Sequence, residues 1–320
     1  MKKMMFTFAA MVAVSFSAFA AKMDDAPSGS CEGIKIGSGP NGKGYANIVK
    51  DIIKACGSEV PVCEVNTEGG LDNLTSMSTK AIDLGIAQVD TWNTMKAGDE
   101  NIAALQGVFS LNSNYMHIVT SANGFNVEGA KKFGGLMKGD AKRVVISRFS
   151  ELRGQNVAAT GSAQLLIRQL DRQYNYGMNI VDSKNDEDAF KLVSEGRVAA
   201  AIVVSSWPSG SVKKLNQSSG LTLVPFDATL QNNSSYSVRS LNYKNIGVYN
   251  NNSLSIQNVL FTRPFKGEKA TQVAKIKSCI VKNLENLQEG DYQPAWNEIK
   301  NIEDTFGVPK FNLNTKPKNK

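Results

Sequence analysis

The chain has 320 residues and a formal net charge of +7 at pH 7, with 42% hydrophobic and 20% charged residues. Its one histidine, His117, lies in the strand-like run YMHIV, and it has no C-x-x-C pair. These facts exclude a multi-histidine metal site and a C-x-x-C redox pair, and no Ser-His-Asp triad is expected. The basic residues are scattered, without a stripe of aromatic and basic side chains, which argues against nucleic-acid binding.

The N-terminus has the pattern of a secretory signal. Two lysines precede an apolar run over residues 4–14, and a stretch of small residues ends in Ala18-Phe19-Ala20. We therefore expect residues 1–20 to be a cleavable signal peptide that directs the chain to the periplasm. No other run approaches the roughly 20 apolar residues that a membrane span needs.

Short apolar strands alternate with helix-length segments along most of the chain. Helices are expected near 43–56 and from Leu71 onward, and again over 268–288 and 292–305. The predicted strands cover residues 34–37, 62–66, 82–87, 115–119, 156–160, 198–204 and 221–225. This alternation predicts an α/β fold with largely parallel sheets.

A chain of this length without its signal exceeds the size at which one core keeps growing, which suggests two lobes. The two C-terminal helices are expected to pack back on the N-terminal part. Lobe 1 would then comprise 31–121 and 260–311, and lobe 2 would comprise 122–259, with a disordered tail at 312–320. A segment at 127–147 is rich in lysine and arginine; a solvated loop is favoured there, and a docking surface for a transporter or a membrane is the alternative.

The four cysteines, Cys31, Cys56, Cys63 and Cys279, all follow the signal. An even count in an oxidising compartment favours disulfides over free thiols, and three pairings are possible. We favour Cys56 with Cys63, because they flank a short turn whose closure costs little entropy. Cys31 with Cys279 then follows by elimination.

Three glycine turns each follow a strand and open a helix. They are GSGPNGKG at 37–44, TEGGL at 67–71 and TGSA at 160–163. The first imitates nucleotide-binding loops, but Gly44 stands where a Walker A loop has its Ser or Thr, and an exported protein meets little nucleotide. Backbone N–H groups at such helix starts favour an anionic or polar group.

Four segments in order carry a family resemblance: IKIGSGPNGKGYANIVKDI, VNTEGGLDNLTSMSTKAIDLGIAQVD, FSELRGQNVAATGSAQLLIRQL and EGRVAAAIVVSSWPSG. They resemble the TAXI family, the solute receptors of tripartite ATP-independent periplasmic (TRAP) transporters, among the type II periplasmic binding proteins. The resemblance implies a two-lobed fold with two mostly parallel sheets and a ligand cleft between the lobes. It also implies a monomer that captures a small organic acid or amino acid without chemistry or cofactor, and delivers it to an inner-membrane transporter.

The expected ligand contacts combine the three turns with polar and aromatic residues near strand ends. They are Ser38, Gly39, Asn41, Lys43, Tyr45, Thr67, Gly69, Gly70, Asn73, Gln88, Asp90, Trp92, Thr160, Gly161, Ser162, Ser205 and Trp207. Two alternatives stay open: a carrier of an apolar or lipid ligand for an unusual transport system, and a binding protein that serves a sensor. An enzyme on the same fold would need a convergent acid and base pair, and the sequence offers none.

Overall fold

The structure is a computed structural model that describes residues 32–132, 137–230 and 235–313. The predicted signal peptide, and all of the predicted tail except residues 312 and 313, lie outside these ranges. Among the described residues, no helix combines the length and the apolar character that a membrane crossing requires.

The fold alternates strands and helices. The strands are β1 (Ile34–Gly39), β2 (Val62–Asn66), β3 (Leu84–Gln88), β4 (Gln106–Ser121), β5 (Phe125–Lys132), β6 (Met137–Val144), β7 (Asn156–Ala159), β8 (Asn179–Asp182), β9 (Ala200–Ser205), β10 (Leu221–Val224), β11 (Tyr236–Tyr243) and β12 (Val248–Thr262). The helices are α1 (Gly44–Cys56), α2 (Gly70–Ser78), α3 (Val89–Met95), α4 (Glu100–Ala103), α5 (Ser162–Tyr174), α6 (Asp186–Ser194), α7 (Gly210–Lys213), α8 (Gly267–Lys282) and α9 (Leu284–Glu289).

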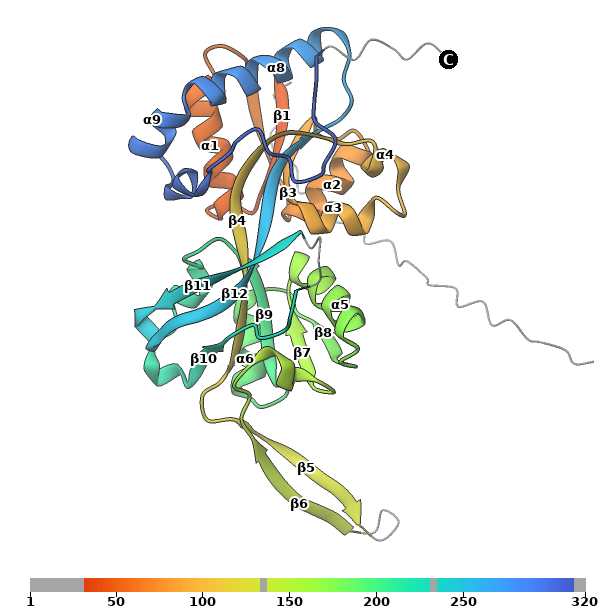
Figure 1. The fold of residues 1–320 in the computed structure, drawn as a ribbon, viewed down its shortest axis with the longest axis vertical. Coiled ribbons are helices and arrows are strands. Elements are labelled where there is room, and N and C mark those ends of the chain that lie inside the picture. Colours follow the sequence, from red (N-terminus) through yellow and green to blue (C-terminus); the bar gives the residue numbers. More distant parts are fainter. Residues whose placement is uncertain (1–31, 133–136, 231–234, 314–320) are drawn as a thin grey trace, which may run out of the picture. The chain divides into compact units, whose positions relative to one another are not determined.

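Parallel strands form the centre of each lobe. In the first lobe, β1 lies between β2 and β3, and α1 buries its apolar face beside α8. In the second lobe, β7 lies between β8 and β9, with α5 and α6 packed against the strands. The predicted α/β class with a two-lobed arrangement is confirmed (Figure 1).

Two long strands join the lobes. β4 and β12 pair antiparallel with each other, β12 continues the first lobe through β3, and β4 continues the second through β9. The two expected sheets are therefore one continuous sheet of order β2-β1-β3-β12-β4-β9-β7-β8. β11 and β10 add to it along β12 and β4.

The C-terminal segment differs from its prediction. The first expected helix is divided at Asn283 into α8 and α9. The second, over 292–305, is wrong, because only a short 3-10 turn forms at Pro294–Glu298. Here the fixed φ of proline starts a turn, and the indole Nε1 of Trp296 donates to the Asp51 carboxylate in the core, 2.9 Å away. The segment after α9 is therefore held on the lobe by single buried apolar side chains and not by one apolar face of a helix.

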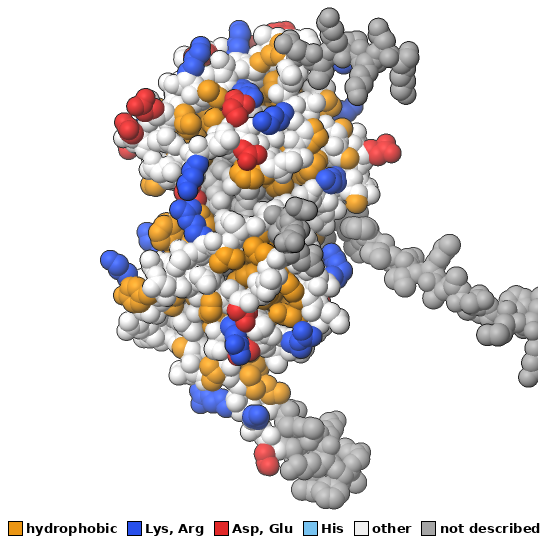
Figure 2. All heavy atoms as spheres, in the orientation of Figure 1, with side chains coloured by type: hydrophobic (Ala, Val, Ile, Leu, Met, Phe, Trp, Pro, Cys, Tyr) orange, Lys and Arg blue, Asp and Glu red, His pale blue; other side chains and the backbone are white. Residues whose placement is uncertain are grey.

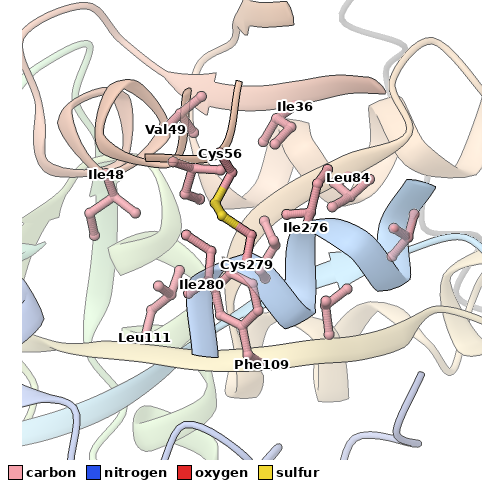
Figure 3. Packing of buried hydrophobic residues seen from close by; sticks show 14 of the residues in the cluster. Ile36, Ile48, Val49, Cys56, Leu84, Phe109, Leu111, Ile276, Cys279 and Ile280 are labelled. Atoms are coloured by element: carbon pink, nitrogen blue, oxygen red, sulfur yellow. A yellow bond between two sulfur atoms is a disulfide. The ribbon is translucent and has the colours of Figure 1, made fainter. Parts of the chain in front are cut away.

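A disulfide joins α1 to α8 and corrects both predicted pairings. Cys56 is bonded to Cys279, with 6.0 Å between their Cα atoms, inside the core cluster shown in Figure 3. Loop-closure entropy concerns the unfolded chain and does not decide the direction of the Cys56 side chain in the folded one. In the folded protein this side chain points toward α8. Cys63 is also disulfide-bonded, and Cys31 lies outside the described residues.

The basic segment forms a hairpin where a solvated loop was favoured. β5 and β6 pair with each other as a separate two-stranded sheet. Figure 1 shows them extending from the second lobe. On the face shown in Figure 2, lysine and arginine side chains are scattered among acidic ones and do not form one continuous patch.

Candidate functional site

Strand register brings the carboxyl ends of both parallel groups to nearly the same level. β3 ends at Gln88, which is paired with Asn258 of β12. β9 ends at Ser205, whose partner Tyr115 on β4 is paired in turn with Ser255 of β12. The two levels are three residues apart along β12, or about 10 Å at the usual rise of a strand. The turns that follow these parallel strands therefore face the junction of the lobes, the position where open α/β sheets bind ligands.

In the first lobe, the predicted polar side chains mainly brace the two glycine turns against each other. The Gly39 N–H donates to Thr67 Oγ1 (2.8 Å), whose hydroxyl donates to Asn73 Oδ1 (2.7 Å). The Asn73 amide then donates to the Ile86 carbonyl (2.8 Å). Ser38 is fully buried and donates to the Val65 carbonyl (3.3 Å). These side chains are occupied within the protein, which leaves main-chain N–H groups as the donors that the turns can offer.

Both turns use glycine where the backbone demands it. Gly39 and Gly69 have φ values of +82° and +116°, in the region that side chains disfavour. Gly70 begins α2, and a Cβ there would lie 3.3 Å from the Ala87 Cα. The start of α2 is therefore held close to the end of β3.

Outer parts of the first turn are exposed. Asn41 accepts from Lys50 Nζ (3.2 Å), and Lys43 is exposed at the N-cap of α1. Behind Lys43, a Cβ on Gly44 would lie 3.4 Å from the hydroxyl oxygen of Ser206, just after β9. The start of α1 thus faces a residue of the second lobe that sequence reasoning did not select.

Tyr45 is the centre of a polar chain at the junction. Its hydroxyl donates to Asn258 Oδ1 (2.7 Å) and accepts from Asn114 Nδ2 (3.0 Å). Both asparagines are buried, and Asn258 Nδ2 has no hydrogen-bond partner among the described residues. Burial raises the pKa of Tyr45 well above its usual value, and the nearby charge of Asp90 raises it further. Sequence reasoning missed both asparagines, because each lies inside a long strand rather than at a turn.

Asp90 lies beside this chain, at the start of α3, and is 5% exposed. Its Oδ1 accepts from the Thr91 N–H (2.7 Å), and its Oδ2 accepts from the Tyr236 hydroxyl of β11 (3.1 Å). Burial raises the pKa of Asp90 to about 6, although these hydrogen bonds act in the opposite direction. The neighbouring Gln88 is also buried and accepts from the Thr91 hydroxyl (3.2 Å).

The two tryptophans have different surroundings. Trp92 is 3% exposed, donates to the Ile102 carbonyl (2.9 Å) and packs against Phe261, so it belongs to the core beneath α3. Trp207 is 38% exposed, directly after β9 and Ser206. Trp207 is therefore the one with indole surface available to a ligand.

The second lobe contributes a third glycine turn, at the start of α5. Thr160 donates to Asp186 Oδ1 of α6 (3.0 Å), and Gly161 caps α5 with φ of +49°. Ser162 is half-buried at the first position of the helix. Ser205 donates to the Ser206 carbonyl (3.3 Å).

His117 lies in the interior and takes no part in this arrangement. Its Nε2 is 2.7 Å from the Tyr243 hydroxyl, and burial lowers its pKa to about 4. Across the described ranges, no group of three or more His, Cys, Asp or Glu side chains could hold a metal ion. The chemistry available at the junction is thus hydrogen bonding and charge, from helix starts, Asp90 and the amides.

Comparisons with known proteins give only distant likenesses. A scan of protein-family models and a search of curated proteins found no match. Among solved structures, an ancestral arginine-binding protein bound to arginine is 15% identical with a TM-score of 0.49, over 83% of this chain and 95% of the other. The substrate-binding protein of an amino acid ABC transporter is 14% identical with a TM-score of 0.46, over 80% and 94%. An arginine transport periplasmic binding protein from Legionella pneumophila is 13% identical with a TM-score of 0.44. Likenesses at this level indicate no ligand and no family.

Proposed function

We propose that this chain is a periplasmic solute-binding protein that captures a small organic acid or amino acid at the junction of its lobes. The observation that carries the proposal is the convergence of three helix starts, those of α1, α2 and α5, at the carboxyl ends of both parallel strand groups. The lobes are proposed as 31–121 with 260–311, and 122–259.

The physical basis is the concentration of unpaired donors. The first N–H groups of a helix have no partner within it, and the helix dipole adds a partial positive charge there. Gly44, Gly70 and Ser162 occupy the first positions of the three helices. The side chains that might otherwise compete for these donors, such as Thr67 and Asn73, are bonded elsewhere. A carboxylate of the ligand satisfies such donors without any catalytic group.

The finer assignment follows from the sequence resemblance. We propose a receptor of the TAXI type, exported by its signal peptide, that works as a monomer and delivers its ligand to an inner-membrane transporter. Closure of the lobes would exchange solvent around the ligand for donors from both lobes. The closeness of Gly44 to Ser206, whose hydroxyl oxygen would lie 3.4 Å from a Cβ added at Gly44, supports closure at this junction.

Calorimetry on ligand-stripped protein tests the proposal, using dicarboxylates, amino acids and a neutral phospholipid. Mass spectrometry of the natively purified protein identifies what copurifies. The variant Ser162→Trp places a large side chain at the start of α5, and we expect it to abolish binding. Ser218→Trp is the matched control, because Ser218 is exposed on the 3-10 turn before β10. If the wild type binds no acid and takes up the lipid, the apolar-carrier alternative replaces the proposal.

A further inference from the structure

The junction contains a buried carboxylate without a positive partner. Among the described residues, no lysine, arginine or histidine forms an ion pair with Asp90, which accepts only from Thr91 and Tyr236. Of the other buried acids of the first lobe, Asp83 contacts both Arg263 (2.8 Å) and Lys269 (2.7 Å), whereas Asp51 accepts from the Gln293 N–H and the Trp296 indole (2.9 Å each). A buried charge is normally paired, because removing it from water is costly. Within the described residues, Asp90 is therefore a buried carboxylate held by neutral donors alone, with acceptor capacity left for a positively charged group.

A donor close to it also lacks a counterpart. Asn258 is fully buried, and its Nδ2 has no hydrogen-bond partner in the part of the chain that the structure describes, while its Oδ1 accepts from the Tyr45 hydroxyl. Asn258 is paired with Gln88, two residues before Asp90. The charge of Asp90 also acts on Tyr45, the residue that Asn258 contacts. A carboxylate without a cation and a donor without an acceptor thus lie at neighbouring strand positions of the junction.

From this geometry we propose that the ligand is an amino acid whose ammonium group is bound by Asp90 and whose carboxylate or side-chain carbonyl accepts from Asn258. This inference rests on the proposed function and selects, between its two ligand classes, the one that carries a positive charge. A dicarboxylic acid would satisfy Asn258 and the helix starts, but it would set a second negative charge against Asp90. A zwitterion satisfies both groups at once, because a charge-assisted hydrogen bond to a buried carboxylate is the strong kind.

A purely structural role for Asp90 predicts different results for the same experiments. Its bonds to the Thr91 N–H and to Tyr236 could serve only to hold the first turn of α3 and to fasten β11. In that case Asp90→Asn would lower the melting temperature and would not change the preference between ligands. In our proposal the same substitution removes an uncompensated buried charge, so the ligand-free variant melts at a higher temperature. It also loses the preference for an amino acid over the acid without the amino group.

The test is calorimetry on ligand-stripped wild type with amino acids and their counterparts without the amino group: L-glutamate against glutarate, L-aspartate against succinate, and L-leucine against isocaproate. We expect at least one amino acid to bind at least about tenfold more tightly than its counterpart. Asp90→Asn should abolish that difference, and Asn258→Asp should weaken binding by about tenfold or more, since it replaces the free donor with an acceptor. Asp182→Asn, an exposed acid paired with Arg168, is the matched control and should retain the preference.

Each outcome is decisive. If glutarate, succinate or isocaproate binds as tightly as its amino acid, or if Asp90→Asn keeps the preference, the inference fails and the proposed function stands. If no acid of either kind binds and the phospholipid does, both fail together. Melting curves recorded for every variant separate a loss of folding from a loss of recognition.

Discussion

Replacing the Asp90 carboxylate by its neutral isostere should stabilise the ligand-free protein at neutral pH. Burial raises the pKa of Asp90 from 3.8 to about 6. The Asp90 carboxyl therefore ionises at a lower pH in the unfolded chain than in the folded protein. The stability that the folded protein gains from holding this carboxyl protonated is complete below pH 3.8. It is lost as the pH rises through about 6. A shift of about two pKa units corresponds to about 3 kcal/mol. Asp90→Asn should recover this amount at pH 7.

The assay is urea unfolding of ligand-stripped protein, followed by tryptophan fluorescence in steps between pH 4 and pH 8. The free energies of wild type and variant should coincide near pH 4 and separate by about 3 kcal/mol at pH 7, with the variant more stable. Other titrating groups cancel in this difference. A variant that is less stable at pH 7, or a difference that is the same at every pH, would refute the reasoning, because Asp90 would then be a structural acceptor.

Three further predictions concern the framework. Asp83→Asn should lower the free energy of unfolding by about 2 kcal/mol at pH 7, because it takes the carboxylate away from the half-buried Arg263 and the exposed Lys269. Urea unfolding measures this change, and an unchanged midpoint would contradict it. Peptide mapping of the non-reduced protein should join Cys56 to Cys279, and replacing both with alanine should cost about 3 kcal/mol, so a peptide joining Cys56 to another cysteine would show the pairing to be wrong. Burial lowers the pKa of His117 from 6.5 to about 4, so its contribution is present above pH 6.5 and is lost as the pH falls through 4. Between pH 6.5 and pH 4 the free energy of unfolding of the wild type should fall by about 3 kcal/mol more than that of His117→Gln. Urea unfolding at several pH values measures this, and an equal fall in both proteins would contradict it.

The strands and helix starts that depend on short-range patterns could be predicted from the sequence. Short apolar runs located β1, β2, β3 and β7, and the glycine turns after β1, β2 and β7 were recognised as helix starts. The same reasoning reached only residues 115–119 of β4 and predicted no strand where β12 lies. These strands contain many Asn and Ser residues, which lack the apolar signal because their partners are polar groups at the junction.

The candidate site was predicted where it depends on turns and missed where it depends on pairing. Asn114 and Asn258 come together with Tyr45 only through the antiparallel register of β4 and β12, which no local pattern reveals. Trp92 was expected at a cleft wall, but α3 turns its indole toward Phe261. Cys56 likewise faces a helix that is 223 residues away in sequence.

The position of β12 also has a consequence for the order of folding. This strand is formed by residues 248–262, yet it is the neighbour of β3 in the first lobe and of β4 at the centre of the sheet. During synthesis, β1, β2 and β3 emerge long before the strand that completes their sheet, so the first lobe cannot close its hydrogen-bond ladder while the chain is still growing. Contacts between such distant segments slow folding. A nascent chain that ends before residue 248 therefore remains open to proteases and to any machinery that handles unfolded polypeptides.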